Sequence, residues 1–250
     1  MSSTTLGPMR ETIKGLVARG SRTTVGKHLL HAATRPDVTA ERFGQVPAWP
    51  GSVDGFEDLA FLFTSSQLNH GVASLRFDEA AFLYGLVSDL GVARIVEIGR
   101  FKGGSTFIMA NAMSPGSSLV SYDLHVALRD DLQGPDLDRE LEAALGRYGL
   151  TERVRLVVGD SRVVELPVPG IDLLFVDGDH TYEGAASDLT RWSPLVRPGG
   201  HLVLHDAVDT GGYGNVYPGI QRAVDELVAQ GEFVPTRGAG TMAHLERRAA

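Results

Sequence analysis

The spacing of apolar and polar residues predicts strands and helices that alternate through the second two thirds of the chain. Five short runs rich in Val, Ile and Leu have the length of buried strands, and longer stretches with one apolar face separate them. The runs cover residues 94–98, 119–122, 154–158, 171–176 and 201–204. Two further runs, at 233–234 and 242–245, predict an antiparallel hairpin at an edge of the sheet. This order predicts an α/β fold with a mostly parallel, seven-stranded sheet and helices on both faces.

The predicted helices carry apolar residues three and four positions apart. The clearest covers residues 136–148, where Leu137, Leu141 and Leu145 share one face and Gly149 follows as the terminating glycine. The other helices are expected at 77–90, 183–192 and 217–230, with a short aromatic helix at 56–63.

The first part of the chain has a different pattern. Weakly amphipathic helices are expected within 9–33, and the stretch 34–55 is rich in Pro and Gly. We therefore divide the chain into an N-terminal segment, 1–74, and one domain, 75–250. The aromatic stretch 56–63 either packs on the core of the domain or belongs to a lid. We predict that the N-terminal segment as a whole is a lid that contributes to substrate recognition.

Composition and charge narrow the classes of function. The 250 residues carry a net charge of −8, and nucleic-acid-binding proteins are usually basic, so we expect no nucleic-acid partner. The chain has no cysteine, which excludes disulfides, thiolate metal sites and a cysteine nucleophile. No apolar run has the roughly 20 residues of a membrane span, and no signal peptide is evident. We therefore expect a cytoplasmic protein without a membrane partner.

The glycine-rich turn after the first strand is the centre of the predicted site. Residues 95–98, which include Glu97, run into Gly99 and then Gly103. Ligands of parallel sheets bind at the carboxyl ends of strands, where a glycine lets the ligand approach the backbone. A dinucleotide fingerprint needs a second glycine two positions after the first, and that position holds Phe101. The turn therefore disfavours a NAD-dependent oxidoreductase, although a tight turn without a ligand also fits.

Polar residues also follow the second and third strands. Asp123 ends the second strand, where an acid can accept hydrogen bonds from both hydroxyls of a ribose. Asp160 and Ser161 follow the third strand. Asp and Ser are also frequent at helix N-termini, so a capping role is the alternative for each of them.

The fourth and fifth strands end in acids and imidazoles. Asp177, Asp179 and His180 follow the fourth strand, and His205 and Asp206 follow the fifth. Charged groups in a cleft are costly unless they are paired or bound to a cation. Because neighbouring parallel strands lie about 4.8 Å apart, we expect Asp177 and Asp206 to face each other across one cleft.

Three segments, in this order and followed by the hairpin, resemble the class I methyltransferases that depend on S-adenosylmethionine (SAM): VEIGRFKGGST, FVDGDHTYEGAASDL and RPGGHLVLHD. Within that family they resemble the group with the sugar O-methyltransferases of antibiotic biosynthesis and the cephalosporin-hydroxylase-like proteins. The resemblance covers residues 75–250. It implies a Rossmann-like fold, SAM as cofactor, and transfer of a methyl group to a hydroxyl of a sugar or other secondary metabolite.

Other functions stay open at this point. The protein could instead be an N-methyltransferase, a hydroxylase-like member of the same group, or a SAM-binding module without catalysis. A homo-oligomer is also compatible with the sequence.

The resemblance also implies roles for particular residues. The acid Glu97 and the glycines of the turn would face the methionine end of SAM, Asp123 its ribose, and Asp160 with Ser161 its adenine. The full set expected to bind the cofactor is Glu97, Gly99, Gly103, Ser105, Asp123, Asp160, Ser161 and Asp177.

A catalytic base and a metal ion are implied as well. His180 or Asp179 would accept the proton of the acceptor hydroxyl. Many relatives bind Mg²⁺ after the fourth and fifth strands, and the matching residues are Asp177, His205 and Asp206. Mg²⁺ prefers oxygen ligands, and Asp177, Asp179 and Asp206 could supply three of them. The imidazole of His205 instead suits transition metals, so the sequence leaves open whether Mg²⁺ or another divalent ion binds.

Overall fold

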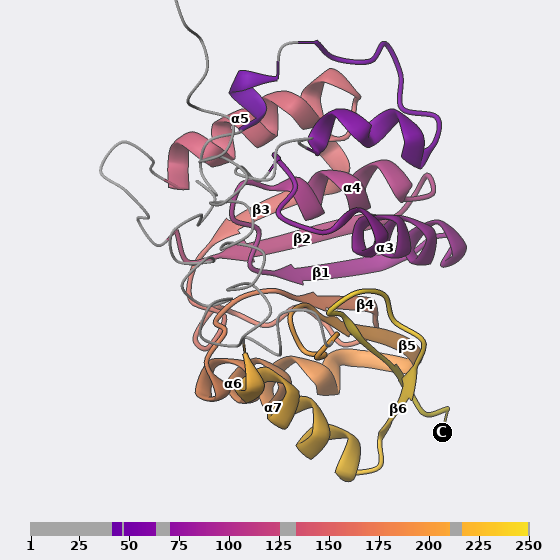
Figure 1. Ribbon diagram of the computed structural model, residues 1–250, viewed down its shortest axis with the longest axis vertical. Helices are drawn as coiled ribbons and strands as arrows, with labels where there is room; N and C mark the ends of the chain where they lie inside the picture. The colour runs from indigo at the N-terminus through magenta and orange to yellow at the C-terminus, as the bar shows by residue number, and fades with distance from the viewer. Residues whose placement is uncertain (1–41, 47, 64–70, 126–133, 211–216, 250) are drawn as a thin grey trace, which may run out of the picture.

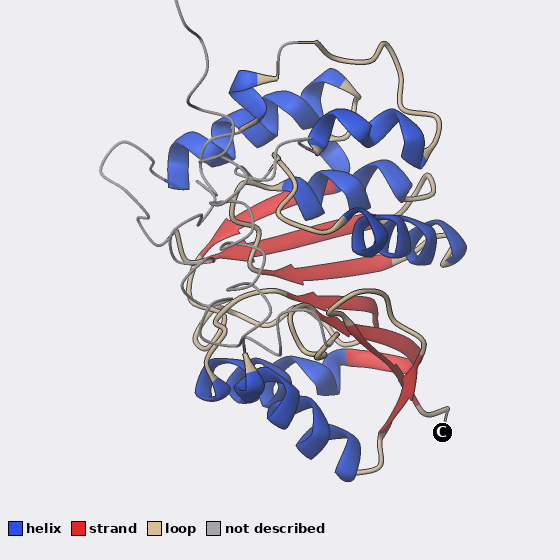
Figure 2. Cartoon of the chain, in the orientation of Figure 1, coloured by secondary structure: helices blue, strands red, loops and turns tan. Residues whose placement is uncertain are grey.

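A seven-stranded sheet forms the centre of the computed structural model, which describes residues 42–46, 48–63, 71–125, 134–210 and 217–249 (Figures 1 and 2). Its strands are β1 (Arg94–Ile98), β2 (Ser118–Asp123), β3 (Val154–Val158), β4 (Ile171–Val176), β5 (Val196–Leu204), β6 (Phe233–Thr236) and β7 (Ala243–Arg247). Their spatial order is β3-β2-β1-β4-β5-β7-β6. Strands β1 to β5 are parallel, and β7 runs antiparallel to both β5 and β6. The predicted fold class is therefore confirmed.

One strand is longer than its sequence pattern indicates. β5 begins at Val196, five residues before the expected start, and includes Pro198 and Gly199. Its register with β4 shifts in this part, between Ile171 and Leu173. Pro cannot donate to a strand ladder and Gly weakens it, which is why the pattern does not show the beginning of β5.

Helices cover both faces of the sheet, as predicted. One face carries α3 (Phe77–Asp89), α4 (Gly104–Ala112) and α5 (Gly134–Arg147), and the other carries α6 (Tyr182–Trp192) and α7 (Pro218–Ala229) (Figure 1). The 3₁₀ helices η1 (Phe43–Gln45) and η2 (Phe56–Leu62) precede α3, η3 (Thr151–Arg153) precedes β3, and η4 (Ser193–Leu195) follows α6. None of the helices formed by the described residues is both long and apolar enough to cross a bilayer.

The described part of the N-terminal segment is built into the core. Leu59 and Leu62 of η2 are fully buried, in the same apolar cluster as Phe107 of α4. Trp49 packs against Phe43 and Phe61, with ring centroids 6.0 and 5.2 Å apart. The aromatic stretch therefore packs on the core, the first of its two interpretations. The helices expected within 9–33 lie outside the described residues, as does most of the expected lid.

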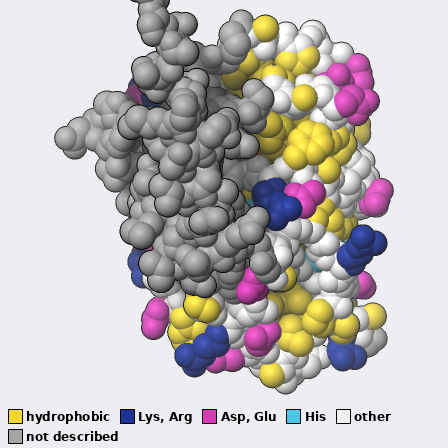
Figure 3. Space-filling view, in the orientation of Figure 1, with side chains coloured by type: hydrophobic (Ala, Val, Ile, Leu, Met, Phe, Trp, Pro, Cys, Tyr) yellow, Lys and Arg dark blue, Asp and Glu magenta, His cyan; other side chains and the backbone are white. Residues whose placement is uncertain are grey.

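The surface shown in Figure 3 carries acidic and basic side chains between apolar ones. Exposed large apolar residues include Val158, at the end of the edge strand β3, and Val163, which follows it.

A buried carboxyl ties β1 to its neighbours. Glu97 is fully buried and accepts hydrogen bonds from the hydroxyls of Ser105 (2.5 Å), Thr106 (2.5 Å) and Ser121 (2.6 Å). Ser105 and Thr106 belong to the first turn of α4, whose N-cap is Gly103 in the left-handed conformation (φ 86°). The two hydroxyls therefore bind the strand instead of capping the helix.

Replacing Glu97 with Gln tests the charge state of this carboxyl. Burial raises the pKa of Glu97 from 4.5 to about 7, although its three hydroxyl partners act in the opposite direction. The folded protein then holds this proton more tightly than the unfolded chain, so the contribution of Glu97 to stability falls as pH rises from about 4.5 to about 7. We expect the wild type to lose on the order of 3 kcal/mol relative to E97Q over this range.

Urea unfolding of both proteins at several pH values measures this difference. A difference between them that does not change with pH would contradict the raised pKa.

Candidate functional site

A cavity of about 690 Å³ opens at the carboxyl ends of the parallel strands. It lies where the strand order reverses between β1 and β4, the place where ligands of open α/β sheets bind. Its volume is that of a small-molecule site. One part is lined by Ile98, Gly99, Phe101, Tyr122, Asp123, Leu124, Gly159, Asp160, Ser161 and Arg162. Asp188 lies beside Ser161 of this part, and the other part is lined by Ser74, Asp177, Gly178, Asp179, His180, Gly184, His205, Asp206 and Tyr217.

Gly99 allows the turns after β1 and β4 to meet. It has φ +85°, and a Cβ at this position would lie 2.1 Å from the carbonyl oxygen of Asp177. On either side of this contact, the Asp177 N–H donates to Ile98 O and the Gly99 N–H donates to Tyr122 O, both at 2.8 Å. The glycine is therefore required by a close approach of two backbone segments.

Asp123 holds the turn after β1 from the side. Its Oδ2 accepts the backbone N–H groups of Arg100 (2.9 Å) and Phe101 (3.0 Å), and its Oδ1 accepts that of His125 (2.7 Å). Each carboxylate oxygen can accept more than one hydrogen bond. The half-buried carboxylate can therefore hold the turn and still accept hydrogen bonds from a ligand in the cavity.

The third-strand residues Asp160 and Ser161 reach the cavity together with an acid that the sequence analysis missed. The Ser161 hydroxyl donates to Asp188 Oδ1 at 2.6 Å, and burial raises the pKa of Asp188. Asp188 lies on the inward face of α6 beside Leu189. An acid on the apolar face of a helix was the signal that could have identified it. Asp160 itself pairs with Arg162, another lining residue that was missed.

Three residues expected to bind the cofactor do not line the cavity. The carboxylate of Glu97 and the hydroxyl of Ser105 are bonded to each other behind the turn. The space beside Gly103 is filled by Leu141, which would lie 2.5 Å from a Cβ there. This corrects the expectation that Glu97, Gly103 and Ser105 face the ligand, because their contacts hold β1, α4 and α5 together. Cofactor binding by the other five residues stays a prediction.

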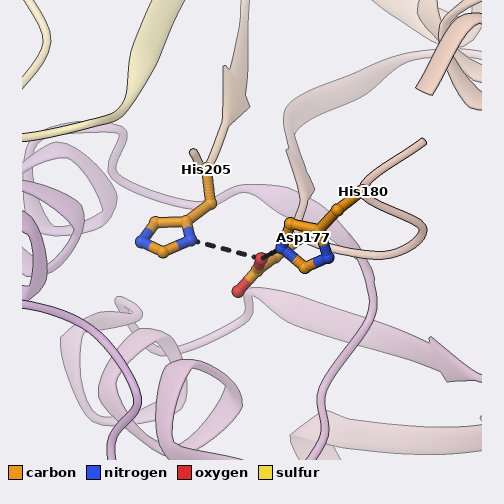
Figure 4. Close-up of side chains that lie close together, drawn as sticks. All are labelled: Asp177, His180 and His205. Carbon is orange, nitrogen blue, oxygen red and sulfur yellow. Dashed lines mark ion pairs between the residues drawn. The ribbon is translucent and has the colours of Figure 1, made fainter. Parts of the chain in front are cut away.

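Two carboxylates and two imidazoles alternate at the other part of the cavity (Figure 4 shows three of them). His205 Nδ1 lies 3.3 Å from Asp177 Oδ1 and 3.6 Å from Asp206 Oδ2. His180 Nε2 lies 3.5 Å from Asp177 Oδ1 and 3.4 Å from Asp206 Oδ2. The strand ends therefore bring Asp177, His180, His205 and Asp206 together, with the imidazoles beside the carboxylates.

These contacts determine the charge on the imidazoles. Hydrogen bonds to Asp177 and then Asp206 raise the pKa of His180 to about 9. Although burial opposes it, Asp177 raises the pKa of His205 above its usual value. An imidazolium has no lone pair, so His180 can act as a base only when these carboxylates bind something else.

The other predicted base has a local structural contact. Asp179 is exposed and lines the cavity, and its Oδ1 accepts the backbone N–H of Thr181 at 2.9 Å. Thr181 is the N-cap of α6. Asp179 therefore stabilises the turn that leads into this helix. Tyr217, which the sequence analysis also missed, places its ring 4.5 Å from that of His180.

A Mg²⁺ site of the expected kind does not fit these residues. Mg²⁺ demands near-octahedral oxygen coordination, and here imidazole nitrogens lie between the two carboxylates. The potential ligand atoms that lie within 4.8 Å of one another belong to Asp177, His180 and His205. His180 therefore takes the place that was predicted for Asp206.

A buried acid stands behind His205. Glu79 of α3 is 1% exposed, and its Oε2 lies 3.1 Å from His205 Nε2. Its Oε1 accepts hydrogen bonds from the N–H (2.7 Å) and the hydroxyl (2.9 Å) of Thr241. Although burial opposes ionisation, His205 and these donors lower the pKa of Glu79 to about 2. The sequence pattern gave no sign of this contact, which joins elements far apart in the chain.

Comparisons with known proteins agree with this geometry. The profile of a family described as a methyltransferase domain matches residues 96–207. An uncharacterized protein of Acanthamoeba polyphaga mimivirus is 28% identical over 145 residues. The aligned part is 56% of this chain and spans only 62% of the length of that relative.

Similar solved structures include an SAH-bound methyltransferase from Podospora anserina, with a TM-score of 0.56, 14% identity and coverage of 96% of both chains. An O-methyltransferase from Bacillus cereus in complex with SAH has a TM-score of 0.53 and 19% identity over 68% of this chain and 80% of that one. TomG from Streptomyces achromogenes is an O-methyltransferase of tomaymycin synthesis, solved in complex with SAM. It has a TM-score of 0.51 and 20% identity over 71% of this chain and 82% of that one. At these identities the likeness shows the fold, and with the profile match it confirms the resemblance to class I methyltransferases.

Two glycine variants test the contact at Gly99. Gly99 and Gly91 both have positive φ, but a Cβ at Gly91 would meet nothing within 4 Å. We expect G91A to cost about 1 kcal/mol from backbone strain alone. G99A should cost about 1–3 kcal/mol more, because the added methyl overlaps the Asp177 carbonyl. Chemical unfolding of both variants measures the difference, and equal losses would show that no such contact exists.

Proposed function

We propose that this chain, whose residues 96–207 match the profile of a methyltransferase domain, transfers the methyl group of SAM to a hydroxyl of a small molecule such as a sugar or other secondary metabolite. The observation that carries the proposal is that one cavity joins the residues expected to bind SAM to the residues expected to bind and deprotonate an acceptor.

The cofactor occupies the part of the cavity between the ends of β1, β2 and β3. Gly99 lets the methionine portion approach the backbone of the turn. Asp123 accepts hydrogen bonds from the ribose hydroxyls with the lone pairs that the turn leaves available. Ser161 and Asp188 stand at the adenine side, where Asp188 can accept a hydrogen bond from the exocyclic amine.

The acceptor occupies the part beside Asp177, His180, Asp206 and Tyr217. Its oxygen attacks the methyl carbon in line, so that an oxygen–carbon bond forms while the carbon–sulfur bond breaks. The acceptor proton passes to a group of the chain, and His180 is the candidate because the acceptor hydroxyl can replace its ring as a partner of Asp177 or Asp206. Holding the two reactants in one cavity supplies much of the rate acceleration.

The direct test is turnover with SAM that carries a labelled methyl group. We expect label to move to at least one member of a panel of hydroxylated sugars, phenols and polyketide-like metabolites. Transfer only to amines would favour an N-methyltransferase, and SAM binding with no transfer would favour a non-catalytic module. The partners, a homo-oligomeric state and a cytoplasmic location stay predictions.

Replacing Asp123 with Asn tests the ribose contact. The variant keeps the shape of the side chain but removes its charge and replaces one of its two acceptor oxygens with an NH2 group, which cannot accept a hydrogen bond. We expect SAM binding to weaken by about 2 kcal/mol, roughly 30-fold, as measured by calorimetry. D225N, at an exposed acid of α7, is the matched control and should bind SAM normally. An unchanged affinity in D123N would remove Asp123 from the cofactor site.

Ser74 provides a second test, because its hydroxyl is buried at the cavity without a hydrogen-bond partner among the described residues. An unpartnered buried hydroxyl is unfavourable, so S74A should leave the ligand-free protein at least as stable as the wild type. We expect it to raise the KM of an acceptor found in the turnover test about 5-fold, since the acceptor bound in this part of the cavity supplies the missing partner.

S117A is the control for the expected effect of S74A on stability. The Ser117 hydroxyl is bonded to Ala93 N–H and Gly91 O, so its removal should lower the melting temperature. A loss of stability in S74A, with the KM of the acceptor unchanged, would show that Ser74 has only a structural role.

A further inference from the structure

We infer that Asp177, His180 and His205 form a site for a divalent transition-metal ion such as Zn²⁺ or Co²⁺, not Mg²⁺, and that Glu79 orients His205 for it. Metal binding by the chain holds or fails independently of the proposed methyl transfer, but an ion held by His180 would leave Asp179, the other predicted base, to accept the acceptor proton.

The potential ligand atoms are spaced as they would be around one metal ion. Asp177 Oδ1 lies 3.3 Å from His205 Nδ1 and 3.5 Å from His180 Nε2. Two ligands that are each about 2.1 Å from a tetrahedral ion stand roughly 3.4 Å apart, which matches both separations. All three atoms lie within 4.8 Å of one another, so small side-chain rotations bring them onto one ion.

The kind of ligand decides which ion fits. Two imidazole nitrogens and one carboxylate oxygen suit zinc, cobalt, iron or nickel, whereas Mg²⁺ takes oxygen ligands and keeps several waters. Asp206 Oδ2 lies 3.4 and 3.6 Å from the two imidazole nitrogens and adds negative charge beside the ion. The ion would face the cavity, which leaves a coordination position for a ligand.

Glu79 supplies the positioning that metal-binding histidines commonly have. Its Oε2 lies 3.1 Å from His205 Nε2, so this nitrogen donates to the acid and Nδ1 turns toward Asp177. Glu79 is held in turn by Thr241 and by the backbone N–H of Arg76 at 2.9 Å. Histidine ligands of metals typically donate their second N–H to a carboxylate in this way, which fixes the ring and strengthens it as a ligand. Glu79 is thus a positioning residue that acts through His205.

The experiment uses the full chain, without a histidine tag and after chelation, titrated with Co²⁺. We expect the ligand-field absorption of a four- or five-coordinate Co²⁺ ion, its loss on addition of Zn²⁺, and no loss in a large excess of Mg²⁺. Absence of this absorption, or displacement of Co²⁺ by Mg²⁺ as readily as by Zn²⁺, would overturn the inference.

Variants identify the ligands. H180A and H205A should each abolish the absorption, whereas H201A should keep it because His201 pairs with His244 away from the cavity. E79Q should weaken Co²⁺ binding about 10- to 100-fold and leave the ligand-field spectrum recognisable, which separates a positioning role from a ligand role.

The H180A variant can be checked for correct folding before its metal binding is measured. His180 is half-buried at the cavity, so H180A can be compared with the wild type by circular dichroism before titration. Normal Co²⁺ absorption in a folded H180A protein would place the metal elsewhere and refute the site.

Discussion

The contact between the turns after β1 and β4 is the constraint on which the rest of the site depends. The Gly99 Cα faces the Asp177 carbonyl so closely that no side chain fits between them. Hydrogen bonds from Gly99 to β2 and from Asp177 to β1 continue the pairing of the strands to their very ends. Gly99 lines one part of the cavity and Asp177 lines the other. The same few backbone atoms therefore fix the position of both residues. A displacement of either turn would move both parts of the cavity at once.

The sequence predicted much of this architecture because the strands are short, apolar and regularly spaced. Strands β1, β3 and β4 have the predicted bounds, and α5 is shifted by one or two residues. The beginning of β5 was not predicted, because Pro198 and Gly199 are unfavourable in strands and the pairing of β5 with β4 is irregular there. Local patterns identify elements well, and they miss the places where pairing with a neighbour overrides propensity.

The candidate site was predicted less completely, for a physical reason. Residues that follow strands were identified, since parallel strands bring their carboxyl ends to one edge. Glu79 and Asp188 come from helices, and they reach the site only through the packing of α3 and α6 on the sheet. The prediction for Glu97 was wrong: an acid at the end of a strand suggested a contact with the ligand. In the structure its carboxyl group instead accepts hydrogen bonds from three hydroxyls behind the turn.

The burial of η2 has a consequence for protein engineering. Leu59 and Leu62 are fully covered by the domain, and each would lose about 1.5–3 kcal/mol of transfer free energy if exposed. A chimera that exchanges the whole N-terminal segment at residue 74 for that of a relative would therefore disturb the apolar core. The described residues 42–46 and 48–63 are therefore best retained with the host domain in such a graft.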